Sequence, residues 1–142
     1  MILSKSCEYA IRASVFVASK SQKKQRVGIN EVSEAIGSPR AFTAKILQTL
    51  VRKNILSSAK GPAGGFYLER SDSLHLIDIV RATDGNGLFI SCVLGLRACS
   101  DTQPCPMHKQ VKPIRDQLLT EFSNKPISDF VADLESGKYH LK

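Results

Sequence analysis

The feature that most constrains the fold is a glycine-rich segment at residues 61–65, Gly-Pro-Ala-Gly-Gly, between two short apolar stretches. The stretches at 55–60 and 66–68 are typical of β-strands, and the segment between them can only form a turn. Two short helices are predicted before it. Gly37 ends the first, and Ser38-Pro39 begins the second, with serine as N-cap and proline at the first helical position. Helix, helix, strand, turn and strand in this order describe a winged helix-turn-helix.

Helical periodicity predicts further helices on both sides of this unit. The first would span 4–19, and another would follow the hairpin at about 76–83. The sequence therefore predicts a mainly α fold with a small β-hairpin wing. Residues 1–85 would form its winged helix-turn-helix DNA-binding domain.

A long helix is predicted at 107–123, after a stretch that we expect to be an ordered loop. Its apolar residues recur at helical spacing: Val111, Ile114, Leu118 and Phe122. This stripe exceeds what so small a domain needs to cover its own core, so we expect a helix that pairs with a second copy of the chain. Pro113 predicts a kink, or a helix start nearer 112.

Two parts of the chain are expected after the winged domain. Residues 86–108 would form a cysteine-containing sensor loop. Residues 109–142 would hold the dimerisation helix and a short C-terminal helix at about 127–135, which exposes Phe130, Val131 and Leu134 on one side.

The net charge of +7 is unevenly distributed. Residues 1–70 carry 12 Lys and Arg against 4 Asp and Glu, whereas residues 71–142 carry 8 against 9. Such a basic half favours a polyanionic partner, most commonly nucleic acid; a solvated basic face without a partner is the alternative. No stretch approaches the roughly 20 apolar residues of a membrane span, and the N-terminus lacks a signal-peptide pattern. We therefore expect a cytoplasmic protein without a membrane partner.

Three of the four cysteines lie close together, as Cys92, Cys99 and Cys105, and His108 follows in a C-x2-H arrangement. In a reducing compartment such cysteines are metal ligands or redox-active thiols more often than structural disulfides. Thiolates, with a histidine in place of one, suit an iron–sulfur cluster. Three cysteines and a histidine also suit tetrahedral zinc, and thiols that sense oxidants without any metal are the third possibility.

Two stretches resemble a known family. The run INEVSEAIGSPRAFTAKILQTLVRKNILSSAKGPAGGFYL, followed by LIDIVRATDG, is similar to the winged-helix regulators that include IscR, NsrR and CymR, and CVLGLRACSDTQPCPMH resembles their cluster-binding loop. The likeness covers residues 1 to about 135. It implies a homodimeric repressor that reads palindromic promoter DNA and is joined mostly by its long C-terminal helix. In many members three loop cysteines hold an iron–sulfur cluster, whose presence or redox state changes the affinity for DNA.

The resemblance places candidate DNA contacts at the start of the second helix of the motif and at the wing. These candidates are Ser38, Pro39, Arg40, Ala41, Phe42, Thr43 and Lys45 on the helix, and Lys60 and Gly61 at the wing. Arg40 can bind a guanine or a phosphate, and phosphate contacts are at least as common. Where some relatives carry a base-reading glutamate, this chain has Ala44, so its base preference should differ. Lys60 stands where relatives place a minor-groove arginine, and it keeps the charge without the planar fork.

By the same resemblance, the three loop cysteines would bind a [2Fe–2S] or [4Fe–4S] cluster, which needs a fourth ligand. His108 is the first candidate because it lies close to the third thiol in the sequence. In some members a carboxylate at the start of the first helix reaches the cluster of the partner subunit. That makes the partner subunit's Glu8 the second candidate and the adjacent Cys7 the third. The first cysteine spacing is one residue longer than in the best-known cluster regulators.

Other functions are compatible with parts of the same sequence. A regulator of the same family could be free of a cluster and controlled by thiols or by a partner protein, or it could bind zinc. A redox enzyme or thiol switch would favour a C-x2-C pair or a cysteine at a helix N-terminus with a base nearby. The sequence has no C-x2-C, GxGxxG or Walker motif, so we expect a DNA-binding regulator and not an enzyme.

Overall fold

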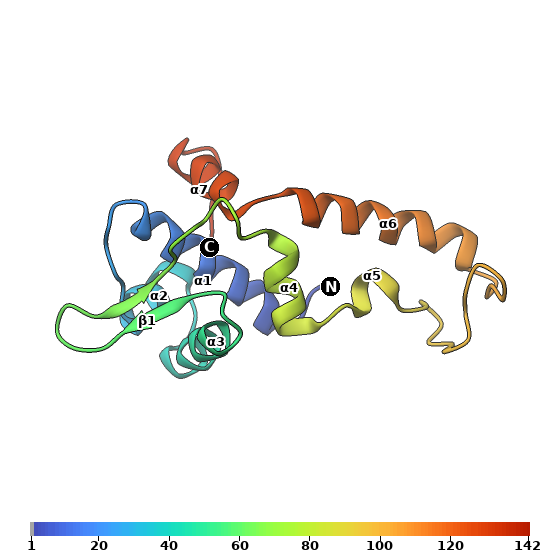
Figure 1. Cartoon of the computed structure of the whole chain (residues 1–142), viewed down its shortest axis with the longest axis horizontal. Coiled ribbons are helices and arrows are strands. Elements are labelled where there is room, and N and C mark those ends of the chain that lie inside the picture. Colours follow the sequence, from blue (N-terminus) through green and yellow to red (C-terminus); the bar gives the residue numbers. More distant parts are fainter. Residues whose placement is uncertain (1) are drawn as a thin grey trace.

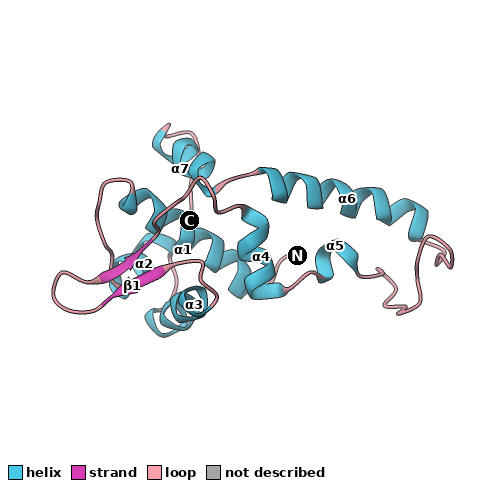
Figure 2. Cartoon of the chain, viewed as in Figure 1, coloured by secondary structure: helices cyan, strands magenta, loops and turns pink. Residues whose placement is uncertain are grey.

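Residues 2–142 are described by a computed structural model, in which helices predominate and one β-hairpin is present (Figure 2). The elements in chain order are α1 (Lys5–Ser21), α2 (Ile29–Ile36), α3 (Arg40–Arg52), β1 (Ser57–Ala59), β2 (Gly65–Tyr67), α4 (Leu76–Asp84), α5 (Gly87–Ile90), α6 (His108–Asn124) and α7 (Ile127–Glu135). The predicted mainly α fold with a hairpin wing is confirmed. No helix in this part of the chain has the length and apolar character needed to cross a membrane.

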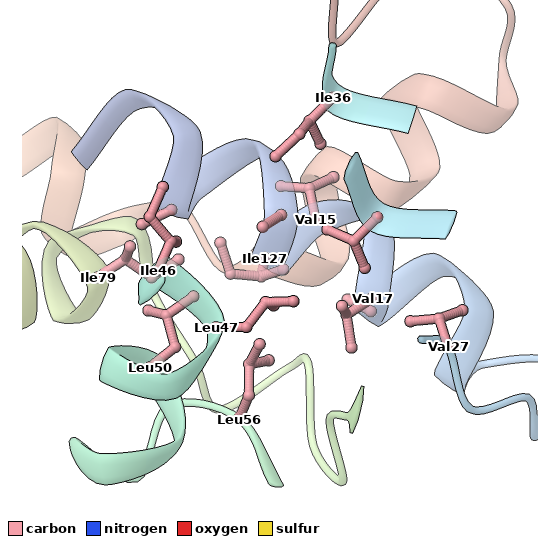
Figure 3. Close-up of a cluster of buried hydrophobic side chains, with 14 of the residues drawn as sticks. Val15, Val17, Val27, Ile36, Ile46, Leu47, Leu50, Leu56, Ile79 and Ile127 are labelled. Atoms are coloured by element: carbon pink, nitrogen blue, oxygen red, sulfur yellow. The ribbon is translucent and has the colours of Figure 1, made fainter. Parts of the chain in front are cut away.

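The core of the body lies between α1, α2, α3 and α7 (Figure 3). Val15 of α1, Ile36 of α2, Leu47 and Leu50 of α3 and Ile127 of α7 are all completely buried in one cluster. Full burial of a Val, Leu or Ile side chain contributes roughly 1.5–3 kcal/mol. Packing between helices distant in the sequence therefore holds the helix-turn-helix in place.

The turn between α2 and α3 differs from the prediction in one respect. Gly37 ends α2 in the left-handed conformation, at φ 66°, as expected. However, α3 begins at Arg40 with Pro39 as its N-cap, and Pro39 has an extended ψ of 141°. Ser38 is therefore not the N-cap and Pro39 is not the first helical residue. Ser38 instead belongs to the turn, where its carbonyl oxygen accepts a 2.6 Å hydrogen bond from Ser33 Oγ.

The wing is an antiparallel hairpin of β1 and β2 that is tied to the segment before α2. Val27 and Phe66 exchange backbone hydrogen bonds of 3.1 and 2.7 Å. Gly65 makes this approach possible, because its φ is 140° and a Cβ at that position would lie 2.7 Å from the Val27 carbonyl oxygen. The wing and the loop between α1 and α2 are therefore one connected surface.

A long arm, formed by α5, the cysteine loop and α6, projects from the body (Figure 1). α5 was not predicted, since it lies in the stretch expected to be a loop. α6 begins at His108, so a start near 112 is wrong, and Pro113 lies inside the helix.

The apolar stripe of α6 is divided between two surroundings. Leu118 and Phe122 pack against the buried cluster of Cys7, Ile77, Val80 and Phe89. The Phe89 and Phe122 rings meet edge to face, with their centroids 5.7 Å apart. The prediction that the whole stripe is more than the chain's own core needs is therefore only partly right. Leu118 and Phe122 contribute to packing within the chain. Ile114, by contrast, is 59% exposed.

α7 returns from the arm to the body. The backbone N–H of Ile127 donates to the Leu74 carbonyl at 2.8 Å, and Val131 is buried in the main core. Phe130 and Leu134 pack partly buried against that core. The expectation that this helix exposes its apolar side is therefore wrong, because the helix packs against α1.

Candidate DNA-binding face and metal centre

The outer surface of α3 carries part of the predicted contact set. Pro39, Arg40, Ala41 and Lys45 are exposed at its start. Thr43 is fully buried, and its Oγ1 donates to the Pro39 carbonyl at 3.0 Å. Ser38 is only 7% exposed. These two side chains face the interior of the helix-turn-helix, Ser38 from the turn and Thr43 from α3, which corrects the expectation that they face outward.

Arg40 and Phe42 are held by neighbouring helices. Arg40 Nε donates to Asn30 Oδ1 at 2.8 Å, which leaves the terminal nitrogens of the guanidinium for an outside acceptor. Phe42 is half-buried, and its ring meets that of Tyr9 edge to face at 5.6 Å. The hydrogen bond to Asn30 therefore orients the Arg40 side chain before it meets an outside ligand. Phe42 mainly packs α3 against α1.

One exposed residue on this surface, Gln48, is not among those predicted from the sequence. Gln48 is exposed, and it follows Ala41 and Lys45 at the helical spacing of i, i+4 and i+7. The three side chains therefore form one outward stripe. Gln48 could have been predicted from the sequence as a residue on the side of α3 opposite the buried apolar stripe.

The wing and the adjacent loop form a second basic surface. Lys60 and Gly61 are exposed at the wing tip, and Lys24 and Arg26 line a polar hollow with wing residues 62–64. The Arg26 guanidinium lies 4.8 Å from the centroid of the Tyr67 ring. Among residues 2–142, none of these three cations has a carboxylate within 4.0 Å. Glu31 also lines the hollow, where its carboxylate accepts from the Gly28 backbone N–H at 3.4 Å, so the three cations remain open to an outside anion.

The cysteine loop brings the predicted thiols together at the far end of the arm. The Sγ atoms of Cys92 and Cys105 are 3.5 Å apart, and all three loop sulfurs, including that of Cys99, lie within 4.8 Å of one another. His108 Nδ1 lies 3.2 Å from Cys99 Sγ, while its Nε2 lies 2.9 Å from Asp101 Oδ1. His108 is thus beside the thiol group, with its second ring nitrogen oriented by a carboxylate, as is usual for a metal-ligating histidine.

The local environment changes the ionisation of these groups. Backbone N–H groups of Leu96 and then Leu94 lower the pKa of Cys92 to about 7. The backbone N–H of Cys105 lowers the pKa of Cys99, but burial and the neighbouring sulfurs outweigh it and the pKa is raised. The hydrogen bond from His108 lowers the pKa of Asp101. One thiol is therefore prepared to bind metal as thiolate near neutral pH, since the thiolate is the ligating form.

The donor set fits a thiolate-bound metal group. Two sulfurs on one tetrahedral zinc ion lie about 3.8 Å apart when each Zn–S bond is about 2.3 Å, close to the spacing seen here. The cavity that the cysteines line with His108 and Arg115 has a volume of about 10 Å³, which is room for about one water molecule. As the side chains lie, the space fits a single ion, and a cluster of several atoms would require the loop to open.

The two other candidate ligands are not part of this group. Cys7 is completely buried in the cluster beneath α4 and α6, and burial raises its pKa to about 11. It therefore cannot reach a metal without unpacking that cluster, which corrects the third-ranked candidate. Glu8 lies on α1, where its carboxylate contacts Lys5 Nζ at 3.1 Å, and it does not join the loop sulfurs within one chain.

Comparison with known proteins agrees with this architecture. A family model named Rrf2, described as an iron-dependent transcriptional regulator, matches residues 3–133. An HTH-type transcriptional regulator of Aquifex aeolicus is 28% identical over 134 residues, which cover 92% of each chain. The structure of CymR, the global cysteine regulator of B. subtilis, superposes with a TM-score of 0.76 at 17% identity and covers 92% of this chain and 95% of that one. IscR of T. potens gives 0.75 at 15% identity, covering 96% and 90%.

The fold and the family match together define the class: the chain is a winged-helix transcription regulator. Within that class it belongs to the Rrf2 family.

Proposed function

We propose that the protein is a homodimeric repressor that reads a palindromic promoter site with its two α3 helices and its two wings. The observation that carries this proposal is the outward stripe of α3 together with the basic surface of Lys24, Arg26 and Lys60, none of which has a carboxylate within 4.0 Å among residues 2–142. In winged helix-turn-helix proteins the second helix of the motif enters the major groove. The wing lysine then meets the adjacent backbone or minor groove.

Dimerisation through the arm is supported by the surface of α6. This helix of 17 residues has no buried residue, and Ile114 on it is 59% exposed. Further large apolar side chains are exposed on and just after α5, namely Ile90, Val93, Leu94 and Leu96. A clustered apolar surface of this kind marks an interaction site in a soluble domain. A symmetric dimer would set the two α3 helices about one DNA turn apart, ~34 Å, or a multiple of it.

Selection from a random-sequence duplex library tests the DNA-binding proposal. The recovered sites should be palindromes, and the selected duplex should bind less tightly as salt rises, because each contacted phosphate releases counterions. Replacing Lys60 with Ala should weaken binding and flatten the salt slope by roughly one unit. Lys138→Ala removes the same charge from the exposed C-terminal segment and serves as the matched control. No enrichment of any sequence would contradict the proposal.

The loop cysteines are proposed to hold an iron–sulfur cluster, around which the loop would have to open, with His108 as fourth ligand and the partner subunit's Glu8 as the alternative. The three converging thiols, the oriented histidine and the family's description as iron-dependent support this choice. Such a cluster supplies a group that responds to redox state, to nitric oxide and to the supply of iron and sulfide. A structural zinc ion is the second candidate, favoured by the sulfur spacing and the small cavity.

The position of the loop suggests how a bound metal group could influence DNA binding. The loop joins α5 to α6, and α6 packs against α4, which packs in turn on α1 and α3. A metal group would fix the angle between α5 and α6, and hence the placement of the two α3 helices in the dimer. The coupling expected for such a link is ~1–3 kcal/mol, or about 5–150-fold in affinity.

Anaerobic purification followed by visible absorbance and by iron and zinc analysis tests the metal centre. Cys99→Ala should lose the bound metal, whereas Cys7→Ala, which alters a buried thiol outside the loop, should keep it. Metal-loaded and metal-free protein are then compared on the selected duplex at one salt concentration. Equal affinities would remove the sensing role, and protein purified without any metal would favour a regulator controlled by its free thiols or by a partner protein.

A further inference from the structure

Arg115 connects α6 to the start of the cysteine loop. Its Nη1 donates to the carbonyl oxygen of Ile90 at 3.1 Å and also to that of Ser91. These carbonyls belong to the last residue of α5 and to the residue just before Cys92. The Arg115 guanidinium therefore holds the backbone where the chain leaves α5, immediately before Cys92.

The same guanidinium has an unmet donor. Arg115 Nε is buried, and within residues 2–142 it has no hydrogen-bond partner. Arg115 also lines the small cavity that the three cysteines and His108 enclose. A buried donor without an acceptor costs about 1–3 kcal/mol, and more when the group is charged. A residue of the cavity wall therefore carries both a positive charge and, within residues 2–142, a buried donor that remains free.

We propose that Arg115 is a positioning and charge-balancing residue of the metal centre, and this inference rests on the proposed function of the loop as a metal site. Three thiolates around one divalent ion leave a net charge of about −1, which the guanidinium offsets from the cavity wall. Its Nη1 keeps the backbone before Cys92 in place, and its positive charge lies in the wall of the cavity that would hold the thiolate-bound group. Charge-assisted hydrogen bonds of this kind are about twice as strong as neutral ones.

Two substitutions separate the charge from the loop anchor. Lysine keeps the positive charge but loses the planar fork that reaches two carbonyls and a third acceptor. Glutamine loses the charge altogether. A purely structural anchor would suffer about equally from both changes, whereas a charge-balancing residue would suffer far more from glutamine.

Titration of the metal-free, anaerobic full-length protein with Co²⁺ tests the proposal, since the sulfur-to-cobalt absorbance reports thiolate binding directly. Arg115→Gln should raise the Kd for Co²⁺ about tenfold, and Arg115→Lys should raise it less than threefold. Lys109→Gln removes a positive charge from an exposed position of the same helix, and should change the Kd less than twofold. Far-UV circular dichroism checks that each variant is folded.

Three results would overturn the inference while leaving the metal centre intact. The first is a Kd for Co²⁺ in Arg115→Gln within twofold of the wild-type value. The second is an equal rise in Kd in Arg115→Gln and Arg115→Lys. The third is a rise in Kd in Lys109→Gln as large as that in Arg115→Gln. If Arg115→Gln does not fold, Arg115→Lys decides alone, and a loss above tenfold overturns the role of charge. A wild-type protein that binds no Co²⁺ would instead overturn a single-ion centre at these thiols, and this inference with it, whereas the iron and zinc analysis decides on the cluster separately.

Discussion

The body and the arm bury their apolar side chains to very different degrees. In the body, Leu47, Leu50 and Ile127 are completely enclosed by side chains of the same chain. In the arm, α6 has no buried residue at all, and its Ile114 is largely exposed. The body is therefore complete as a single chain, whereas the arm leaves surface for something outside it.

This difference indicates which part of the molecule supplies most of the stability and which part can change its conformation when a metal group binds. Regions with few buried apolar contacts open at lower free energy than core helices. A sensor needs such a region, because a ligand can shift only an equilibrium whose states are close in energy. We therefore expect the wing and α3 to keep their structure while the cysteine loop and α6 respond to the metal group.

The largest expected effect lies in the body. Leu50→Ala should destabilise the protein by about 2–5 kcal/mol, because it removes a fully buried side chain and leaves a cavity. Ile114→Ala on the arm should change the free energy of unfolding by less than about 0.5 kcal/mol. Urea unfolding of the metal-free protein at low concentration, where association is least, measures both. Similar losses in the two variants would break the comparison between body and arm.

An intermediate effect concerns the exposed face of the arm. Ile114→Asp places a charge on the apolar face proposed for the dimer, so it should shift the protein toward monomer in sedimentation experiments. Because one α3 helix then binds alone, affinity for the selected palindrome should fall at least tenfold, about 1.4 kcal/mol. Thr120→Asp adds the same charge on a different side of α6 and should change neither property. A dimer that persists in Ile114→Asp would show that the dimer interface does not include this face of α6.

Local sequence signals predicted most of the body. Gly37, the turn at 61–65 and the helical period before each of them depend on backbone chemistry that acts within a few residues. The start of α3 was misplaced because Pro39 adopts an extended ψ in the turn rather than the first helical position. α5 was missed because a helix of four residues has no periodicity to detect.

The candidate site shows the same limit. Cysteine spacing identified the three thiols, since ligands close in sequence are easily brought together. The burial of Thr43 could not be predicted, because its hydroxyl is satisfied by the Pro39 carbonyl and a threonine looks polar in the sequence. Arg115 was not found either, because its partners are the carbonyls of Ile90 and Ser91, and only the folded loop brings these to α6.

The smallest expected effect leaves the fold unchanged and distinguishes the thiols of the two regions. Cys92 has a pKa lowered to about 7, so its thiolate is present above pH 7 and is lost as the pH falls through that value. Cys7, buried under α4 and α6, has a pKa raised to about 11.

In metal-free protein at pH 8, iodoacetamide should therefore label Cys92 first, Cys99 more slowly and Cys7 last. Below pH 7 the rate at Cys92 should fall about tenfold per pH unit, because the thiolate is the nucleophile. Mass spectrometry of peptides from timed samples measures each rate, and labelling of Cys7 as fast as Cys92 would mean that the base of the arm opens as readily as its tip.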